Sequence, residues 1–185
     1  MFPQYGRTYP IPVTFALIFA NVIVFILLQL GGNTLYLVLS QTGELFFAGA
    51  YWQAFTAMFV HFDILHIAFN MYGLFYFGRL NEISYPRNQY LAIYFGAGLA
   101  GNLASLYLIP PNAPTGGASG AIFGLVGSYV ARERKGVNMG MAVAYAALIF
   151  LLSSGPGVNV YAHLLGVVTG FVLGVLFSSA KRDLL

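Results

Sequence analysis

The chain has 185 residues, of which 59% are hydrophobic and only 7% are charged. Soluble domains carry about 25% charged residues, so this composition excludes an ordinary soluble protein and indicates a single membrane domain over residues 1–185. The formal net charge of +3 is too small and too scattered for a nucleic-acid interface, and the lack of cysteine excludes disulfides and thiolate metal sites.

Apolar segments, taken in chain order, predict an all-α bundle of membrane-spanning helices. A membrane helix needs about 20 mostly apolar residues. Six segments fit or approach this length: 13–30, 55–78, 90–109, 118–131, 137–152 and 158–179. Glycine and proline clusters separate them. The first segment is long enough to span, and we expect no cleavable signal before it.

The connection between the first two segments, residues 31–54, is the one long loop that these segments leave. It is itself apolar, with Phe47 and Trp52 among its residues. We therefore expect it to lie in the membrane interface rather than free in water.

The basic residues predict the topology. All eight fall at the termini or in the second and fourth predicted loops: Arg7, Arg79, Arg87, Arg132, Arg134, Lys135, Lys181 and Arg182. Cytoplasmic loops carry the excess of lysine and arginine in membrane proteins. The sequence thus predicts a multi-pass protein of the cell membrane with both termini in the cytoplasm.

Several polar residues lie inside predicted spans, where ionisable groups are costly and are functional candidates. His61 and His66 fall in the second segment and His163 in the sixth. Asn70 follows His66 by four residues, on the same helical face. Ser119 stands at the start of the fourth segment.

Counting back from the cytoplasmic ends at about 1.5 Å per residue gives each of these residues a depth. Ser119, His66 and His163 come to roughly 20 Å, Asn70 to about 14 Å and His61 to about 27 Å. In a core about 30 Å thick, the first three share a layer about 10 Å below the outer surface. A serine and a histidine at one level are the pair that nucleophilic catalysis requires.

The fourth segment is short, and the serine explains why. If the helix begins near Ser119, the Gly116-Gly117 backbone lies at membrane depth, which is tolerated only beside protein or a water-filled cavity. Hydrolysis needs that water. The free N–H groups at the start of such a helix would also point at an oxyanion.

Glycine spacing predicts that the fourth and sixth helices pack closely. The sixth carries glycine every four residues, and the fourth carries a matching row of small residues; the two sets are Gly166, Gly170 and Gly174, and Gly120, Gly124, Gly127 and Ser128. Small residues at this spacing let helix backbones approach each other.

Simpler explanations exist for each residue alone. Ser119 could be a helix N-cap, and His163 could make an interhelical hydrogen bond. Asn102 and Ser105 in the third segment are best explained as contacts between helices.

Two other classes of site and function are disfavoured. His61 and His66, five residues apart, do not share a helical face as metal ligands would, and no carboxylate lies at ligand spacing. We therefore expect no metal, nucleotide or other cofactor. A small transporter would show inverted repeats, which are not evident here.

Three separated motifs, in this order, resemble those of the rhomboid family of intramembrane serine proteases. The first runs from His61 through His66 to Asn70 and is followed by Gly78-Arg79-Leu80-Asn81-Glu82. The second is Gly117-Ala118-Ser119-Gly120, and the third is Ala162-His163 with Gly166 and Gly170. The resemblance covers nearly the whole chain and suggests the minimal six-helix form.

The resemblance implies a serine endopeptidase that cleaves transmembrane or membrane-proximal segments of other membrane proteins. Its catalytic pair would be Ser119 and His163, without an acidic third member. His66 and Asn70 would help the Ser119 N–H to stabilise the oxyanion. Substrate helices would enter between the second and fifth helices.

Three further residues take supporting roles in this interpretation. Gly117 belongs to the nucleophile motif, and Phe123 matches an aromatic, usually tyrosine, that packs on the catalytic histidine. His61 is expected to be structural, at the outer end of the second helix. The chain has Trp52-Gln53 where the family commonly has Trp-Arg, which puts one loop-anchoring contact in doubt.

One alternative stays close to the same family. A catalytically inactive rhomboid-like scaffold would bind transmembrane segments without cleaving them. Such proteins lack the serine or the histidine, and both are present here.

Overall fold

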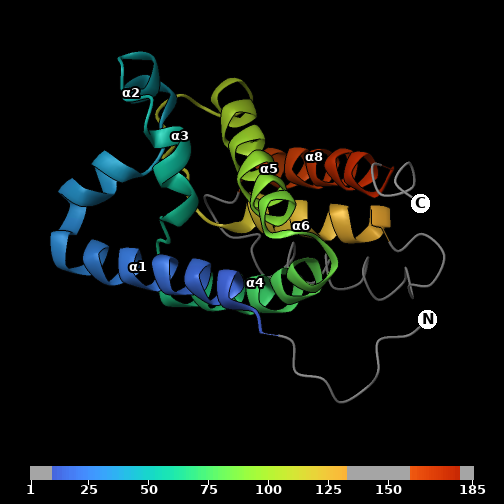
Figure 1. Ribbon diagram of the computed structural model, residues 1–185. Helices are drawn as coiled ribbons and strands as arrows, with labels where there is room; N and C mark the ends of the chain where they lie inside the picture. Colours follow the sequence, from blue (N-terminus) through green and yellow to red (C-terminus); the bar gives the residue numbers. More distant parts are fainter. Residues whose placement is uncertain (1–9, 133–158, 180–185) are drawn as a thin grey trace.

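The computed structural model of the protein describes residues 10–132 and 159–179. Within these residues every named element is helical, and an isolated bridge pairs Gln41 with Thr115. The elements are α1 (Pro12–Leu39), α2 (Gly43–Phe47), α3 (Gln53–Thr56), the 3₁₀ turn η1 (Ala57–Phe59), α4 (Ile64–Ser84), α5 (Arg87–Leu108), α6 (Ser119–Arg132) and α8 (Val160–Ser179). Figure 1 shows their arrangement. The predicted all-α class is confirmed.

Among the described residues, three helices are long and apolar enough to cross a membrane, namely α1, α5 and α8. The bent pair formed by Gln53–Phe59 and Ile64–Ser84 is a fourth candidate. The fifth predicted span, 137–152, lies outside the described residues. Several candidate spans in one chain fit the predicted multi-pass membrane protein.

The first helix is longer than predicted. We expected it to end at Leu30, but α1 continues to Leu39 across a kink at Gly32, where φ is 58° and ψ is −158°. Glycine adopts this left-handed conformation without a Cβ clash, so the chain changes direction there and becomes helical again. The prediction of a loop from residue 31 was therefore wrong.

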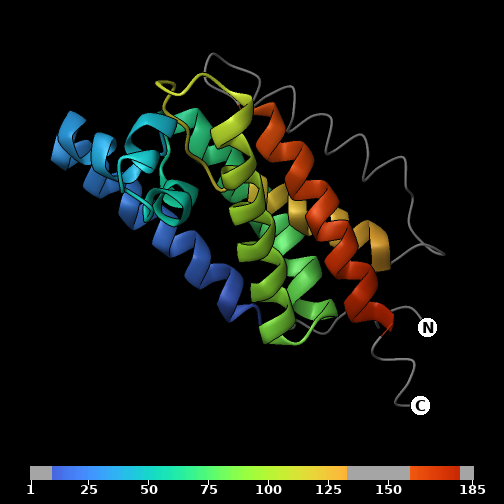
Figure 2. The ribbon, with the colours of Figure 1, turned by 90° about the horizontal axis from the view of Figure 1, so that it is seen from above.

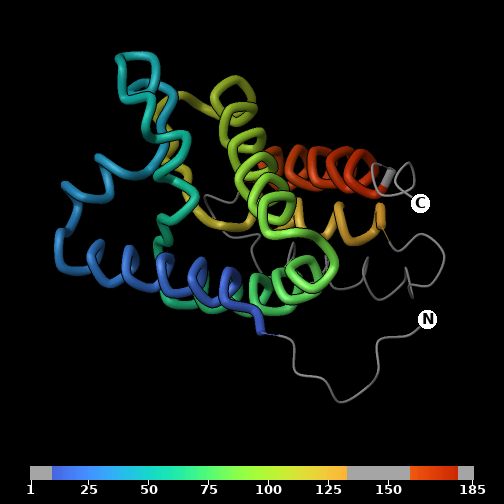
Figure 3. The backbone as a smooth tube through the Cα atoms, in the orientation of Figure 1, coloured from blue at the N-terminus to red at the C-terminus, as the bar shows by residue number. Residues whose placement is uncertain are grey.

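The second predicted segment, 55–78, is not one continuous helix in the structure. The chain turns by 91° between Gln53–Phe59 and Ile64–Ser84, a change of direction that the backbone trace of Figure 3 follows. The longer helix begins after Asp63 because the Asp63 carboxylate accepts a hydrogen bond from the His66 N–H at 2.8 Å. Aspartate is a strong N-cap, and here it restarts the helix.

The other described helices agree with the predicted segments 90–109, 118–131 and 158–179 to within three residues at each end. As predicted, α6 starts at Ser119 and is short. Its 14 residues correspond to roughly 21 Å, less than the hydrocarbon core.

The short helix α6 is the centre of the bundle. It packs against α8, α5 and α4, and Figure 1 shows it between α8 and α4. Figure 2 shows α5 and α8 side by side, with α1 on the opposite side of the molecule. Because α6 is covered on these sides, nearly all of its residues are buried, Ser119 included.

The predicted close packing of the two glycine rows is confirmed. A Cβ atom on Gly166 would overlap the carbonyl oxygen of Gly120, and one on Gly170 would overlap that of Gly124. The two backbones are thus in direct contact, which fixes the height of α8 against α6.

Candidate active site

Ser119 is the first residue of α6, and the segment before it holds a conformation that only glycine adopts readily. Gly117 has a φ of +132°. Its N–H donates to the Ala57 carbonyl at 2.9 Å, and Thr115 pairs with Gln41. These bonds fix the approach of the chain to Ser119 from two directions.

His163 lies in the first turn of α8 and contacts the serine directly. Its Nε2 is 2.7 Å from the Ser119 Oγ, a hydrogen-bond distance. Both residues are buried, at 3% and 8% exposure, so this bond is formed largely away from bulk water. The structure therefore brings together the two residues that the sequence placed at one depth.

Phe123 lies one turn after Ser119 and stacks on the imidazole. The two ring centroids are 4.5 Å apart and the planes are inclined by 26°. The aromatic contact that the resemblance implied is present, with phenylalanine in place of tyrosine. It holds the imidazole plane without taking one of its nitrogens.

His66 faces the segment before Ser119. A Cβ on Gly117 would lie 2.9 Å from the His66 Nε2 and 3.5 Å from the Ser119 Oγ. The space beside Gly117 is thus bordered by an imidazole nitrogen on one side and the serine hydroxyl on the other. An oxyanion placed there would be near both groups.

Asn70 lies one turn further along α4. Its Nδ2 donates to the His66 carbonyl at 2.9 Å, and the same side chain interacts with the His61 imidazole. The side chain is therefore tied to the turn that carries His66, rather than hydrogen-bonded to Ser119.

His61 is not part of a helix, although the prediction placed it in a continuous one. It lies in the break before α4 and is completely buried. Its ring meets that of His66 edge to face with centroids 4.9 Å apart, although we expected the two histidines not to share a helical face. That expectation assumed one continuous helix, and the break removes the helical geometry.

Besides the His66 ring, His61 contacts the Asn70 side chain and two backbone groups. Its Nδ1 is 3.2 Å from the Phe59 carbonyl, and its Nε2 lies 3.5 Å from the Ala118 N–H. Among the described residues, no group of three or more histidine, aspartate or glutamate side chains could hold a metal ion.

Gln53 anchors the long connection, although the departure from the family pattern put this contact in doubt. Its Nε2 donates to the carbonyls of Leu37 and Val38 at 3.0 and 3.4 Å, and its Oε1 accepts from the Thr42 N–H at 3.2 Å. A buried amide thus serves as both donor and acceptor here.

The contact between Ser105 and Asn159 also belongs to the site, although the sequence did not indicate it. The Asn159 Nδ2 donates to the Ser105 Oγ, and its Oδ1 accepts from the Ala162 N–H at 3.0 Å. The Asn159 carbonyl accepts from the His163 N–H at 3.3 Å. The start of α8, and with it His163, is therefore tied to α5.

Comparison with known proteins adds independent findings. The sequence model of the Rhomboid domain family matches residues 48–180. The chain is similar to Rhomboid protease GluP of Bacillus subtilis (strain 168), with 32% identity over 170 residues, 85% of this chain and 33% of that protein. Putative rhomboid protease YdcA of the same bacterium is 30% identical over 144 residues, 72% of this chain and 71% of that protein.

A eukaryotic relative has the same level of similarity. Rhomboid-like protease 3 of Toxoplasma gondii is 31% identical over 143 residues, which is 72% of this chain and 54% of that protein. The chain thus spans between 33% and 71% of the length of these three relatives.

Proposed function

The chain belongs to the rhomboid family of intramembrane proteases, and on that premise we propose that it is an active serine endopeptidase with Ser119 as nucleophile and His163 as general base. The observation that carries this proposal is the 2.7 Å distance between the Ser119 Oγ and the His163 Nε2. An inactive scaffold has no need of a buried serine held against a histidine.

The distance supports a simple path for the proton. As the Ser119 oxygen attacks the scissile carbonyl, its proton passes to the His163 Nε2. The same nitrogen then gives the proton to the leaving amine, which releases one product and leaves an acyl-enzyme. A water molecule then attacks the acyl-enzyme and gives its proton to the His163 Nε2. The nitrogen passes this proton to the Ser119 Oγ, which frees the serine and releases the second product.

The groups around Gly117 would stabilise the oxyanion. The first turn of a helix has N–H groups without intrahelical partners, so the Ser119 N–H is available. His66 borders the same space and can donate from its Nε2. Asn70 would contribute by orienting the His66 turn or by rotating its amide toward the oxyanion.

The variants His66→Ala and Asn70→Ala test this assignment. The cleavage rate should fall in both, by up to about 10²–10³-fold for one lost oxyanion donor, but less than in Ser119→Ala. Single-turnover rates with saturating substrate would measure it. Wild-type rates in both variants would contradict the oxyanion assignment.

The protein is a multi-pass membrane protein, and its substrates would be transmembrane or membrane-proximal segments of other membrane proteins. The distribution of arginine and lysine supports cytoplasmic termini in a cell membrane and therefore cleavage near the outer end of the substrate segment. Substrate would enter between α4 and the predicted span 137–152.

Cleavage of a single-span substrate in liposomes tests the proposal. Wild-type protein should cleave it, whereas Ser119→Ala and His163→Ala should lose at least about 10³-fold in rate. Ser178→Ala is a matched control, because the hydroxyl of Ser178 is buried without a hydrogen-bond partner among the described residues. Each variant should also be assayed with a chelator.

The outcomes separate the alternatives. Equal cleavage by wild type and Ser119→Ala would refute the mechanism, and loss of activity on chelation would point to a metal. Binding of substrate without cleavage by the wild type would identify a scaffold.

A further inference from the structure

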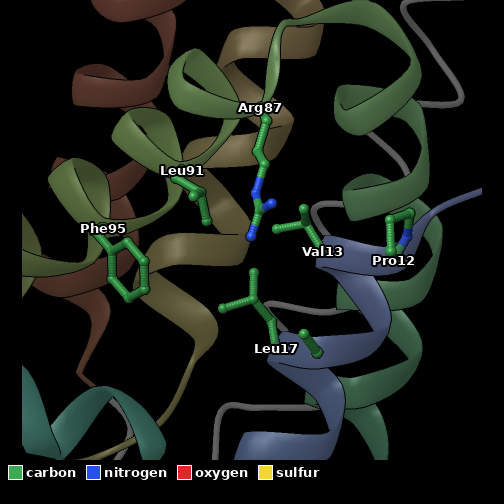
Figure 4. A pocket seen from close by; sticks show the side chains of 7 residues that line it. Pro12, Val13, Leu17, Arg87, Leu91 and Phe95 are labelled. Atoms are coloured by element: carbon green, nitrogen blue, oxygen red, sulfur yellow. The ribbon is translucent and has the colours of Figure 1, made fainter.

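A groove of about 230 Å³ lies between α1 and α5, on the side of the bundle away from α8. The groove remains open because α1 and α5 pack mainly against other helices: α1 against α4, and α5 against α6 and α8. Its lining consists of Pro12, Val13, Ala16, Leu17, Arg87, Leu91 and Phe95. Figure 4 shows these side chains from both helices facing a common space.

The walls of the groove are apolar and its mouth is open. Val13 and Leu17 are buried, Leu91 and Phe95 are half-buried, and Ala16 is exposed on the outer surface of the bundle. In a membrane this surface faces lipid. A helix is about 10–12 Å across with its side chains, so a groove of this volume suits an acyl chain better than a transmembrane helix.

Arg87 supplies a charge at one end of this apolar groove. It is the first residue of α5, and Figure 4 shows its guanidinium directed into the space between the helices. The Arg132 guanidinium at the end of α6 lies 4.8 Å from the centre of the Tyr85 ring, so the end of α6 is near the connection between α4 and α5. In the topology that the basic residues predict, this is the cytoplasmic end of the helices, where lipid headgroups begin.

The carboxylate of Glu82, which lies at the start of α1, already accepts hydrogen bonds from groups other than Arg87. Glu82 accepts from the N–H groups of Val13 and Thr14, both at 2.8 Å, and from the Thr14 hydroxyl at 2.6 Å. None of the residues that line the groove is acidic. The guanidinium therefore faces a space in which an external anion would be its partner.

We propose that this groove binds an anionic phospholipid, with the phosphate on Arg87 and one acyl chain between α1 and α5. Guanidinium binds phosphate oxygens in a bidentate manner, and basic pockets between membrane helices bind anionic headgroups. A zwitterionic headgroup fits less well, because the groove offers no carboxylate for its ammonium group.

Native mass spectrometry tests the site directly. The full chain is reconstituted in vesicles of equimolar dioleoyl phosphatidylglycerol and dioleoyl phosphatidylethanolamine and then released in detergent. Wild-type protein should retain about fivefold more phosphatidylglycerol, and Arg87→Gln should abolish this preference, as expected for one arginine at an anionic headgroup. Arg79→Gln, an exposed arginine outside the groove, is the matched control and should retain the preference.

A second variant tests the apolar part. Ala16→Phe fills the mouth of the groove from an exposed position and should reduce retained phosphatidylglycerol to the level of Arg87→Gln. Equal losses in Arg79→Gln and Arg87→Gln would overturn the proposal in favour of general surface attraction. Equal retention of the two lipids by the wild type, or full retention by Ala16→Phe, would also overturn it. None of these readouts depends on proteolysis.

Discussion

Gly117 is the residue whose conformation most directly shapes the space beside Ser119. Its φ of +132° strains any other residue, and a Cβ there would approach the His66 Nε2 to 2.9 Å. Gly49 offers a comparison, since its φ is +114° but no atom lies within 4 Å of the position that a Cβ would take. Substitutions at these two glycines therefore distinguish the effect of backbone strain from the effect of a side chain that enters the site.

We predict that Gly117→Ala lowers the cleavage rate by about 10²-fold or more, because the methyl group would occupy the place of the oxyanion. Gly49→Ala should carry similar strain, of about 1–3 kcal/mol, and retain activity. Cleavage rates and thermal unfolding of both variants in detergent would measure this. If both variants lost activity to the same extent, backbone strain would be responsible, and not a methyl group in the place of the oxyanion.

The contact between Ser119 and His163 could be predicted at this scale because helix geometry is regular. The rise per residue fixes how far each lies from the charged end of its helix, so equal depth follows from counting. His61 could not be placed in this way. The run from Phe55 is apolar enough for one continuous helix, and its one sign of a new helix start is Asp63, whose carboxylate accepts from the His66 N–H.

At the scale of elements, the long connection between α1 and α4 shows where sequence reasoning loses precision. Its apolar character was evident, but its short helices were not, because four- and five-residue helices have too few residues for periodicity. The anchoring by Gln53 was missed for another reason. An amide that replaces a charged side chain can still donate to two carbonyls when it is buried.

The start of α8 gives the prediction that belongs to this scale. Asn159 caps the helix through Ala162 and binds Ser105 on α5, so it fixes the turn that carries His163. Asn159→Asp keeps an acceptor for the Ala162 N–H but loses the donor to Ser105, and its carboxylate can bind Ser105 only if that hydroxyl leaves the Gly101 carbonyl to which it now donates. Asn159→Ala loses both.

We expect Asn159→Ala to destabilise the protein by about 1 kcal/mol through the lost cap and to lower the cleavage rate. Asn159→Asp should unfold close to the wild type yet also cleave more slowly, because His163 is less well positioned. Thermal unfolding and single-turnover cleavage would separate the two effects. Wild-type cleavage by Asn159→Asp would show that the link to α5 does not position the histidine.

For the molecule as a whole, the arrangement of the site depends on how closely α8 approaches α6. The small residues along both helices predicted this approach, because spacing alone places them on one face. The side on which α1 lies, and the groove that this leaves beside α5, followed from no such pattern. They result from the packing of α1 on α4 and from the Glu82 carboxylate that binds its first N–H groups.

Gly170 tests the dependence of the site on this approach, at a distance from the reacting groups. A methyl group on Gly170 would overlap the Gly124 carbonyl, so α6 and α8 would have to separate. We expect Gly170→Ala to cost about 1–3 kcal/mol through overpacking, and to slow cleavage because His163 moves away from Ser119. Gly96→Ala is the control, since its Cβ would lie 3.4 Å from Leu173 on α8, an ordinary contact.

Gly96→Ala should be neutral, or more stable by up to about 1 kcal/mol, because alanine favours a helix over glycine. Thermal unfolding in detergent and cleavage of the same single-span substrate would compare the two variants. If Gly170→Ala unfolded and cleaved like Gly96→Ala, the backbones of α6 and α8 would have room to spare. The position of His163 would then depend on its local contacts, those with Asn159 and Phe123 among them, rather than on the contact between the two helices.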